Sequence, residues 1–376
     1  MRRTLSGSVL ILLAAALLLS ACASPSSGSA VATPNPSGGS AAVTLNGAGA
    51  TFPQPVYSQW IQAYEQADPS AIINYQGIGS GGGKKSIIDG TVDFAGSDAL
   101  LTLDEYSQGK DLQMLPAVAG AVVLIYNLPG LTETDPALVL DRQTLVGIYN
   151  ATITHWNDPA LLALNPALKS KLPNAAITAV HRSDGSGTTE MFTRALSAFS
   201  PDWKAGAAQS VQWLVDKAGS GVGGKGNPGV AATVQNTPNS IGYVELQYAV
   251  GNKMTYAQMI NKAGKTVGAN AQSLASAMND FTDKFTDQLT NIIVDGPGAD
   301  SWPICGYTYI IIHTTSMKDP AKAQALLKYL EWTQTSPQAA QVANILGYAA
   351  VPKPVQDKVI ARLHQVTVNG KAVLTQ

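Results

Sequence analysis

The sequence predicts an α/β protein with two domains, and two observations support this prediction. The body of the chain, residues 43–376, has the apolar content of a globular protein, and its length suits two domains better than one. Three segments of this body also share one pattern, in which a short apolar strand leads through a loop of Gly, Ser and Thr into a helix. Strands that alternate with helices in this way are typical of α/β folds.

The first 21 residues are predicted to be an export signal. Arg2 and Arg3 give a positive start, and the apolar run at 9–19 is too short to span a bilayer comfortably. The run ends in LSAC at 19–22, which resembles the lipobox of bacterial lipoproteins and implies that Cys22 is lipidated after cleavage. The alternative is an ordinary cleavage site with an incidental cysteine.

Residues 22–42 are predicted to form a lipidated, flexible tether. From residue 23 onward the segment is almost wholly Ser, Gly, Pro, Ala and Thr, which offer too little apolar surface to offset the entropy of ordering them. A lipid anchor followed by such a tether would hold the body just outside the membrane.

Composition argues against several classes of partner and cofactor. The formal net charge is −1 and Lys and Arg form no long run, so nothing indicates nucleic acid or an acidic membrane surface. If Cys22 is lipidated, Cys305 has no partner for an intramolecular disulfide. The histidines have no paired metal-ligand spacing, and we expect neither a metal nor another cofactor; they are His155, His181, His313 and His364.

The three strand–loop–helix segments suit anion binding. The first amides of a helix have no acceptor within the helix, and the helix dipole puts partial positive charge there. Glycines let the backbone approach a ligand, and Ser or Thr hydroxyls add donors. The alternative is that these loops are only turns and helix caps. Their strands, loops and helix starts are 43–45, 47–52 and Pro53; 72–75, 77–83 and Lys84; and 177–180, 181–187 and Thr188.

The second loop does not match a nucleotide-binding P-loop. Ile78 stands where that pattern requires its first glycine, and Lys85 stands where it requires Ser or Thr after Lys84. A Mg²⁺ ion would therefore lack its hydroxyl ligand.

Several motifs, in the same order along nearly all of the body, closely resemble the substrate-binding protein of the bacterial phosphate-specific ABC transporter. The motifs are GAGATF at 47–52, YQGIGSGGGK at 75–84, VDFAGSDA at 92–99, RSDGSGT at 182–188, GGKGN at 223–227 and IGYVE at 241–245. The resemblance implies a periplasmic-binding-protein fold of type II, in which two α/β lobes joined by a two-stranded hinge close on a ligand. It implies lobe I from 43–122 and 303–376, and lobe II from 123–302.

The resemblance also implies a set of phosphate-binding residues. From lobe I these are Thr51, the amide of Phe52, the hydroxyl and amide of Ser80, and Asp98. From lobe II they are the guanidinium of Arg182 and the amides and hydroxyls at a helix start, with Asp184 orienting Arg182; the helix-start residues are Ser186, Gly187 and Thr188.

Asp98 is expected to select the anion. A carboxylate that faces a bound anion is favourable only when the anion carries a proton, as phosphate does near neutral pH and sulfate does not. Sulfate would meet an unpaired like charge. The alternative for Asp98 is a surface turn or a helix cap.

These implications predict a monomeric, exported protein that is lipid-anchored to the outer face of the cell membrane, or alternatively periplasmic. It would capture inorganic phosphate and deliver it to the permease and ATPase of an ABC transporter. One alternative keeps the fold and changes the ligand to another tetrahedral oxyanion, or makes the protein a phosphate sensor. A less favoured alternative is a phosphatase that uses Ser186 and Arg182, but no base or metal cluster accompanies that serine.

Overall fold

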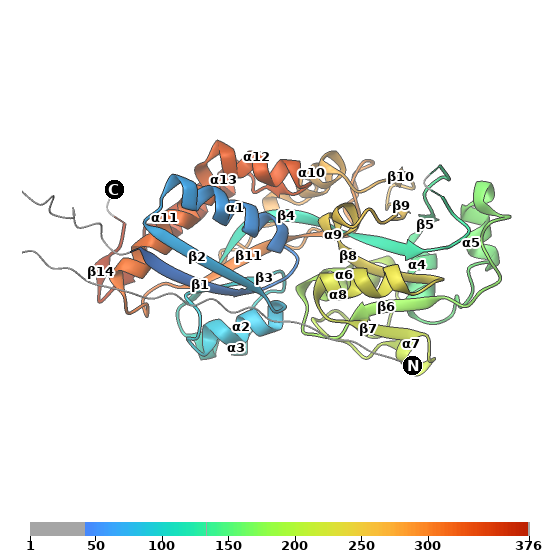
Figure 1. The fold of residues 1–376 in the computed structure, drawn as a ribbon, viewed down its shortest axis with the longest axis horizontal. Coiled ribbons are helices and arrows are strands. Elements are labelled where there is room, and N and C mark those ends of the chain that lie inside the picture. Colours follow the sequence, from blue (N-terminus) through green and yellow to red (C-terminus); the bar gives the residue numbers. More distant parts are fainter. Residues whose placement is uncertain (1–41, 133, 375–376) are drawn as a thin grey trace, which may run out of the picture. The chain divides into compact units, whose positions relative to one another are not determined.

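The computed structural model describes residues 42–132 and 134–374. The predicted signal and the tether up to residue 41, including Cys22, lie outside the described residues. Among those that are described, no helix combines the length and apolar character needed to cross a membrane. Helices and strands alternate along the described chain (Figure 1), which confirms the predicted α/β class.

A long strand, β4 (Leu112–Asn127), runs through the main sheet, whose order is β2-β1-β3-β11-β4-β8-β6-β7, with β12 also paired to β4. β4 pairs with β11 up to Ala121 and with β8 from Val122 onward. The chain crosses back from lobe II next to the point where β4 changes from pairing with β11 to pairing with β8. There the amide of Val122 donates to the carbonyl of Ile304 at 2.8 Å. The predicted division at 122/123 and 302/303 lies next to these crossings, and we keep it as the definition of lobes I and II.

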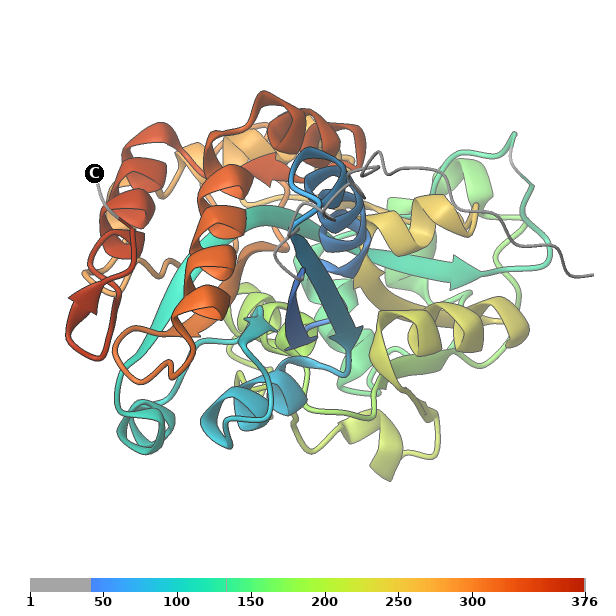
Figure 2. The same cartoon turned by 60° about the vertical axis from the view of Figure 1, so that its left-hand side comes forward.

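Lobe I contains parallel strands β2, β1 and β3, with β11 antiparallel to β3. Helices α1 and α11 lie on one side of this part of the sheet and α2 on the other (Figures 1 and 2). Besides β4, its elements are β1 (Val43–Gly49), α1 (Gln54–Ala67), β2 (Ala71–Gly77), α2 (Ser80–Ile88), β3 (Phe94–Ser97), α3 (Leu103–Gly109), β11 (Cys305–His313), α11 (Pro320–Thr335), α12 (Pro337–Ile345), β12 (Ala349–Ala350), α13 (Lys353–Leu363), β13 (Thr367–Val368) and β14 (Lys371–Ala372).

Lobe II contains parallel strands β8, β6 and β7, with β8 antiparallel to β4. Helix α8 packs across all three of these parallel strands, and α6 packs on β4 and β8. Its elements are β5 (Val139–Leu140), α4 (Arg142–Tyr149), α5 (Pro159–Leu164), η1 (Pro166–Leu168), β6 (Thr178–Arg182), α6 (Gly187–Phe199), α7 (Leu214–Lys217), β7 (Gly221–Gly224), α8 (Gly226–Asn236), β8 (Ser240–Glu245), α9 (Leu246–Gly251), β9 (Gln258–Ile260), β10 (Thr266–Val267), α10 (Ala271–Asn279) and η2 (Thr282–Lys284).

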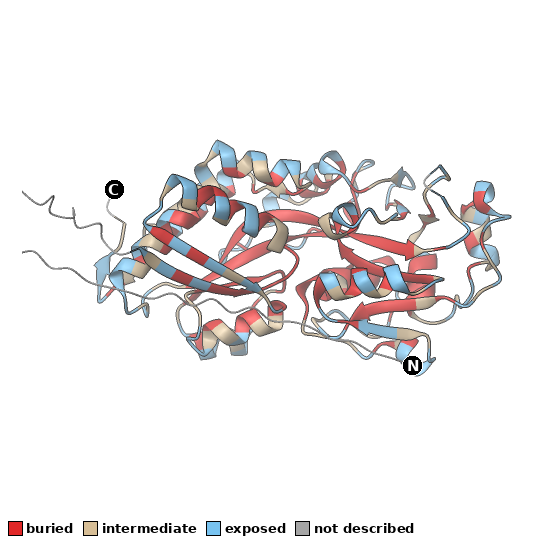
Figure 3. Ribbon diagram, viewed as in Figure 1, coloured by how far each residue is buried: buried red, intermediate tan, exposed pale blue. Residues whose placement is uncertain are grey.

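The central strands are buried and the outer faces of the helices are exposed (Figure 3). Helix α1 shows why. Its side chains Tyr57, Trp60 and Tyr64 recur at helical spacing and are all buried, while the intervening positions include exposed polar residues. Trp60 also donates through Nε1 to the carbonyl of Ala339 at 2.8 Å, so α1 is fastened to α12.

The predicted start of the second helix is wrong by four residues. We expected a loop over 77–83, but α2 begins at Ser80 and includes the glycines that follow. These glycines allow close packing, because a Cβ added at Gly83 would lie 2.5 Å from the Cα of Gly49 in β1. The predicted third loop also begins too early, since His181 and Arg182 are the last two residues of β6.

Candidate functional site

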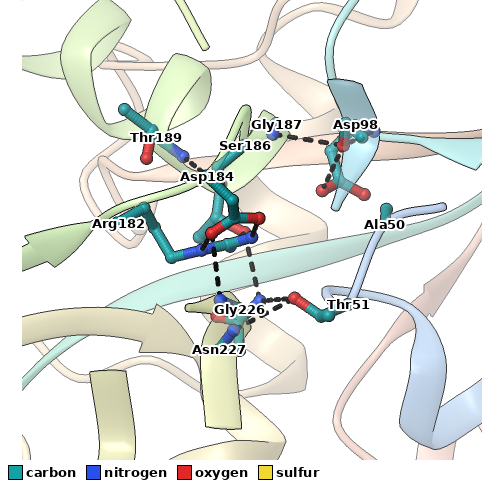
Figure 4. A network of polar contacts seen from close by, with 12 residues as sticks. Ala50, Thr51, Asp98, Arg182, Asp184, Ser186, Gly187, Thr189, Gly226 and Asn227 are labelled. Carbon is teal, nitrogen blue, oxygen red and sulfur yellow. Dashed lines mark hydrogen bonds and ion pairs between the residues drawn. The ribbon is translucent and has the colours of Figure 1, made fainter. Parts of the chain in front are cut away.

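The residues of the candidate site lie where parallel strands of both lobes end. In lobe I, Thr51 follows β1, Ser80 follows β2, and Asp98 follows β3. In lobe II, Arg182 ends β6, and Asn227 follows β7. Ligands of open α/β sheets bind at this carboxyl end of the strands. The fold therefore brings side chains from distant parts of the sequence to one place (Figure 4).

The turn after β1 presents Thr51 and Phe52. Gly49 has a φ of +146°, and a Cβ there would lie 2.0 Å from a carbonyl oxygen of β3, so the close approach of β1 and β3 requires glycine. Two tyrosines hold the carbonyls of the turn: Tyr248 OH donates to Thr51 O at 2.5 Å, and Tyr348 OH donates to Phe52 O at 2.7 Å. These two bonds fix the turn through its carbonyl oxygens and do not involve the backbone N–H groups of Thr51 and Phe52.

Ser80 joins the two lobes at the start of α2. Its Oγ accepts from the amide of Asp98 at 3.2 Å and from the amide of Gly187, in lobe II, at 3.1 Å. It also donates to Asp98 Oδ2 at 3.4 Å. The backbones meet closely here, because a Cβ on Gly187 would lie 2.5 Å from Asp98 Cβ.

Asp98 is buried, with 6% of its surface exposed, and its Oδ1 atom has no hydrogen-bond partner among the described residues. Burial raises the pKa of Asp98 to about 7, although the nearby hydroxyl of Thr308, the charge of Arg182 and the hydroxyl of Ser80 act in the opposite direction. Near neutral pH this carboxyl can therefore change between accepting and donating a proton.

Arg182 is buried and oriented by Asp184. Its Nε donates to Asp184 Oδ1 at 2.7 Å, and its Nη2 donates to Asp184 Oδ2. The same carboxylate accepts from the amide of Gly226 at 3.0 Å. Burial alone would raise the pKa of Asp184, but its bonds to Arg182 and the charge there hold that pKa below its usual value. Asp184 thus contacts Arg182 directly, as its predicted orienting role requires.

The start of α6 carries three more predicted residues. Ser186 caps the helix, because its Oγ accepts from the amide of Thr189 at 3.1 Å, and its own amide donates to the Gln209 carbonyl at 3.0 Å. The amide of Gly187 is engaged by Ser80, as described above. A ligand would therefore have to compete for the Gly187 amide, whereas the Ser186 hydroxyl proton remains available.

Three other predicted donors are unpaired. The backbone N–H groups of Phe52, Ser80 and Thr188 have no acceptor among the described residues, and all three residues are buried. Buried amides without a partner are rare in proteins. Together with the free oxygen of Asp98, they form a set that is complementary to an anion that also carries a proton.

Three helix N-termini meet at this place, and each adds partial positive charge. The N-termini of α2, α6 and α8 carry Ser80, Gly187 and Asn227 in their first turns, and these residues contact one another or Thr51. The charge of Arg182 is balanced by Asp184. The geometry therefore favours an anion held by dipoles and hydrogen bonds rather than by excess charge.

Sequence reasoning missed Asn227. It lies at the fourth strand–loop–helix unit, β7 to α8, which was not recognised because β7 reads GVGG and lacks the apolar residues of the other strands. The GGKGN motif contains this residue, but the motif alone gave it no role. Tyr248 and Tyr348 were also missed, since a tyrosine far along the chain carries no local sign of its partner.

Two α/β lobes that meet across a dipole-lined site define a solute-binding protein of the periplasmic type. A family model described as PBP superfamily domain matches residues 33–336. The chain is 38% identical over 318 residues to the phosphate-binding protein PstS of Pasteurella multocida, covering 84% of this chain and 88% of that one. It is 40% identical over 312 residues to PstS of Haemophilus influenzae, covering 82% and 89%. The chain thus belongs to the PstS family of phosphate-binding proteins within that superfamily.

A solved structure gives the same fold. The high affinity periplasmic phosphate-binding protein PfluDING, bound with phosphate, superposes with a TM-score of 0.68 at 20% identity, covering 85% of this chain and 93% of that one. At this identity the likeness shows the fold alone, and it confirms the predicted periplasmic-binding-protein architecture.

Proposed function

We propose that this chain captures inorganic phosphate outside the cytoplasm and delivers it to a phosphate ABC transporter. The observation that carries this proposal is the set of unpaired groups at the site: three buried amides that can donate and one buried carboxylate oxygen that can accept. Hydrogen phosphate has several acceptor oxygens for the amides and a proton for the carboxylate, so its chemistry matches these groups. The PstS relatives, whose names state phosphate binding, support the same ligand.

Binding without catalysis fits the geometry. The Ser186 hydroxyl oxygen accepts from the amide of Thr189, as a helix cap does, and Arg182 is held by Asp184. A nucleophilic serine would need a neighbouring base that takes its proton. We therefore propose a carrier and not a phosphatase.

An uptake assay tests the transport function. Deleting the gene should lower the initial rate of radiolabelled phosphate uptake at limiting phosphate, and the full chain should restore it. Arg182→Met, which keeps the bulk of the side chain and removes its donors, should fail to restore uptake. Unchanged uptake in the deletion strain, which lacks the chain, would exclude it as the supplier of this transporter.

We also propose that Cys22 is lipidated and anchors the body to the outer face of the membrane. The proposal is supported by the lipobox-like LSAC at 19–22 and the Ser/Gly/Pro-rich segment that follows. Cys22→Ser should move the protein from the membrane fraction to the soluble exported fraction, while Cys305→Ser should stay with the membrane. Equal partition of both variants would contradict the anchor.

A further inference from the structure

Asn227 contacts two of the predicted donor hydroxyls, one from each lobe, and Figure 4 shows its contact with Thr51. It lies in the first turn of α8, and its side chain is completely buried. Its Nδ2 lies 2.9 Å from Thr51 Oγ1 and 3.2 Å from Thr188 Oγ1. Its backbone amide also donates to Thr51 Oγ1, at 3.0 Å.

The third partner of Asn227 fixes which way its side-chain amide faces. The Oδ1 atom accepts from the backbone N–H of Glu245 at 2.9 Å. Because that N–H can only donate, the amide oxygen must face Glu245, and the NH₂ group must face the two hydroxyls. Asn227 is therefore a donor to both threonines.

These donors determine what the hydroxyls can do. The oxygen of a hydroxyl has two lone pairs, and that of Thr51 receives two N–H groups from Asn227. The oxygen of Thr188 receives the Nδ2 of Asn227 and, at 3.4 Å, the Nη1 of Arg182. Each hydroxyl is left with only its proton to offer, which is what the oxygen of an anion requires.

We propose that Asn227 is a positioning residue that keeps Thr51 and Thr188 oriented as donors to phosphate; this inference rests on the proposed function. Asn227 and Thr188 both belong to lobe II, so the orientation of Thr188 exists before the lobes meet. Thr51 belongs to lobe I, so its hydroxyl is set only on closure. The coupling between Asn227 and Thr188 therefore tests the orientation of a hydroxyl within one lobe, separately from the contact of Asn227 with Thr51 in the other lobe.

A double-mutant cycle on the phosphate Kd of the full chain tests the proposal. Asn227→Ala and Thr188→Val should each weaken phosphate binding roughly ten- to hundredfold, the range of a hydrogen bond to a charged group. In the Thr188→Val background, Asn227→Ala should cost at least about fivefold less than in the wild type, because the hydroxyl that it orients is gone.

Thr193→Val is the matched control. Thr193 is a buried threonine on α6, the helix of Thr188, and it donates to the Thr189 carbonyl at 2.8 Å. The effects of Thr193→Val and Asn227→Ala on the free energy of phosphate binding should be additive. If Asn227→Ala weakens phosphate binding by the same factor with and without the Thr188 hydroxyl, the inference is wrong, while the proposed phosphate-binding function still stands. No phosphate binding by the wild type would overturn the proposed function itself. If Asn227→Ala does not fold, Asn227→Ser, which retains a polar group for the Glu245 amide, replaces it in the same cycle.

Discussion

At the scale of single residues, Asp98 differs from the other predicted site residues because one of its side-chain oxygens is buried without a partner in the described part of the chain. Donors surround the rest of the site, and Arg182 is already paired with Asp184. An anion without a proton would leave the ionised Asp98 carboxylate facing a like charge, a cost of about 1–3 kcal/mol or more. Selection between phosphate and sulfate should therefore depend on whether Asp98 is ionised.

The pKa of Asp98, which burial raises to about 7, gives this selection a pH dependence. Above that pH the carboxylate accepts a proton from phosphate and repels sulfate. Below it the neutral carboxyl can donate to sulfate. We expect sulfate to displace phosphate at pH 5 much better than at pH 8. In an equilibrium dialysis competition, the sulfate concentration that displaces half of the phosphate should be roughly tenfold or more higher at pH 8.

Asp98→Asn is the control for this experiment, because an amide does not titrate. Its sulfate competition should change less between the two pH values than that of the wild type, because only phosphate itself still titrates, and its selectivity should fall more than its phosphate affinity. Wild-type competition that does not change between pH 5 and pH 8 would remove Asp98 from its proposed role.

At the scale of elements, lobe I depends on a carboxylate far from the site, where β4 begins and β11 ends. Asp111 accepts from His313 Nδ1 at 2.7 Å, from the amide of Thr315 at 2.6 Å and from the amide of Ser316 at 2.8 Å. Burial alone would raise the pKa of Asp111, but these bonds hold it well below its usual range. The ionised carboxylate thus holds the start of β4 to the end of β11 and to the residues that follow β11.

The lowered pKa of Asp111 makes its contribution to stability pH-dependent. The contribution is fully present above the unfolded pKa, near 4, and is lost as the pH falls below that value. Asp111→Asn should lower the free energy of unfolding by about 2–4 kcal/mol at pH 7. The difference from the wild type should shrink below pH 4 in urea titrations. Asp104→Asn, at an exposed position on α3, should change little at either pH.

The sequence could predict the elements with a regular local pattern, and it failed where the structure depends on distant packing. Strands β1, β2 and β6 were expected, because apolar runs stand at 43–45, 72–75 and 177–180. The helical start at Ser80 was not, because glycines read as a loop until their contact with β1 is known. β7 was missed because a strand of glycines has no hydrophobic pattern.

The candidate site could be predicted only from several motifs taken together, because no single motif identifies it. Thr51, Ser80 and Asp98 follow strands and Arg182 ends one. These strands lie far apart in sequence, and only the sheet order brings their ends together. Contacts such as that of Asn227 with Thr51, 176 residues apart, leave no local signal. The division into lobes at 122/123 and 302/303 stays a prediction.

At the scale of the whole molecule, the two lobes touch through backbone as well as side chains. The amide of Gly81 donates to the carbonyl of Gly185 at 3.0 Å, and Gly187 lies against Asp98 and Ser80. Groups from both lobes line the site, so a ligand bound by one lobe alone would be only half coordinated. Phosphate should therefore favour the state in which the lobes are closed.

Gly187→Ala should prevent this closure. A Cβ at this position would lie 2.5 Å from Asp98 Cβ and 2.6 Å from the Ala99 amide nitrogen, so the lobes would be held apart. We expect phosphate affinity to fall by roughly a hundredfold or more, with little change in the ligand-free unfolding midpoint. Gly251→Ala, where a Cβ meets nothing within 4 Å, is the control and should bind normally. Normal binding by Gly187→Ala would show that closure does not need this contact.

Calorimetric titration of residues 43–376, freed of carried-over ligand, tests most directly whether the site takes a protonated tetrahedral anion. At pH 8 we predict tight one-to-one binding of phosphate and no heat from sulfate, because Asp98 is then ionised and accepts only from an anion with a proton. Binding of sulfate as tightly as phosphate, or no binding of phosphate, would contradict the role given to this site.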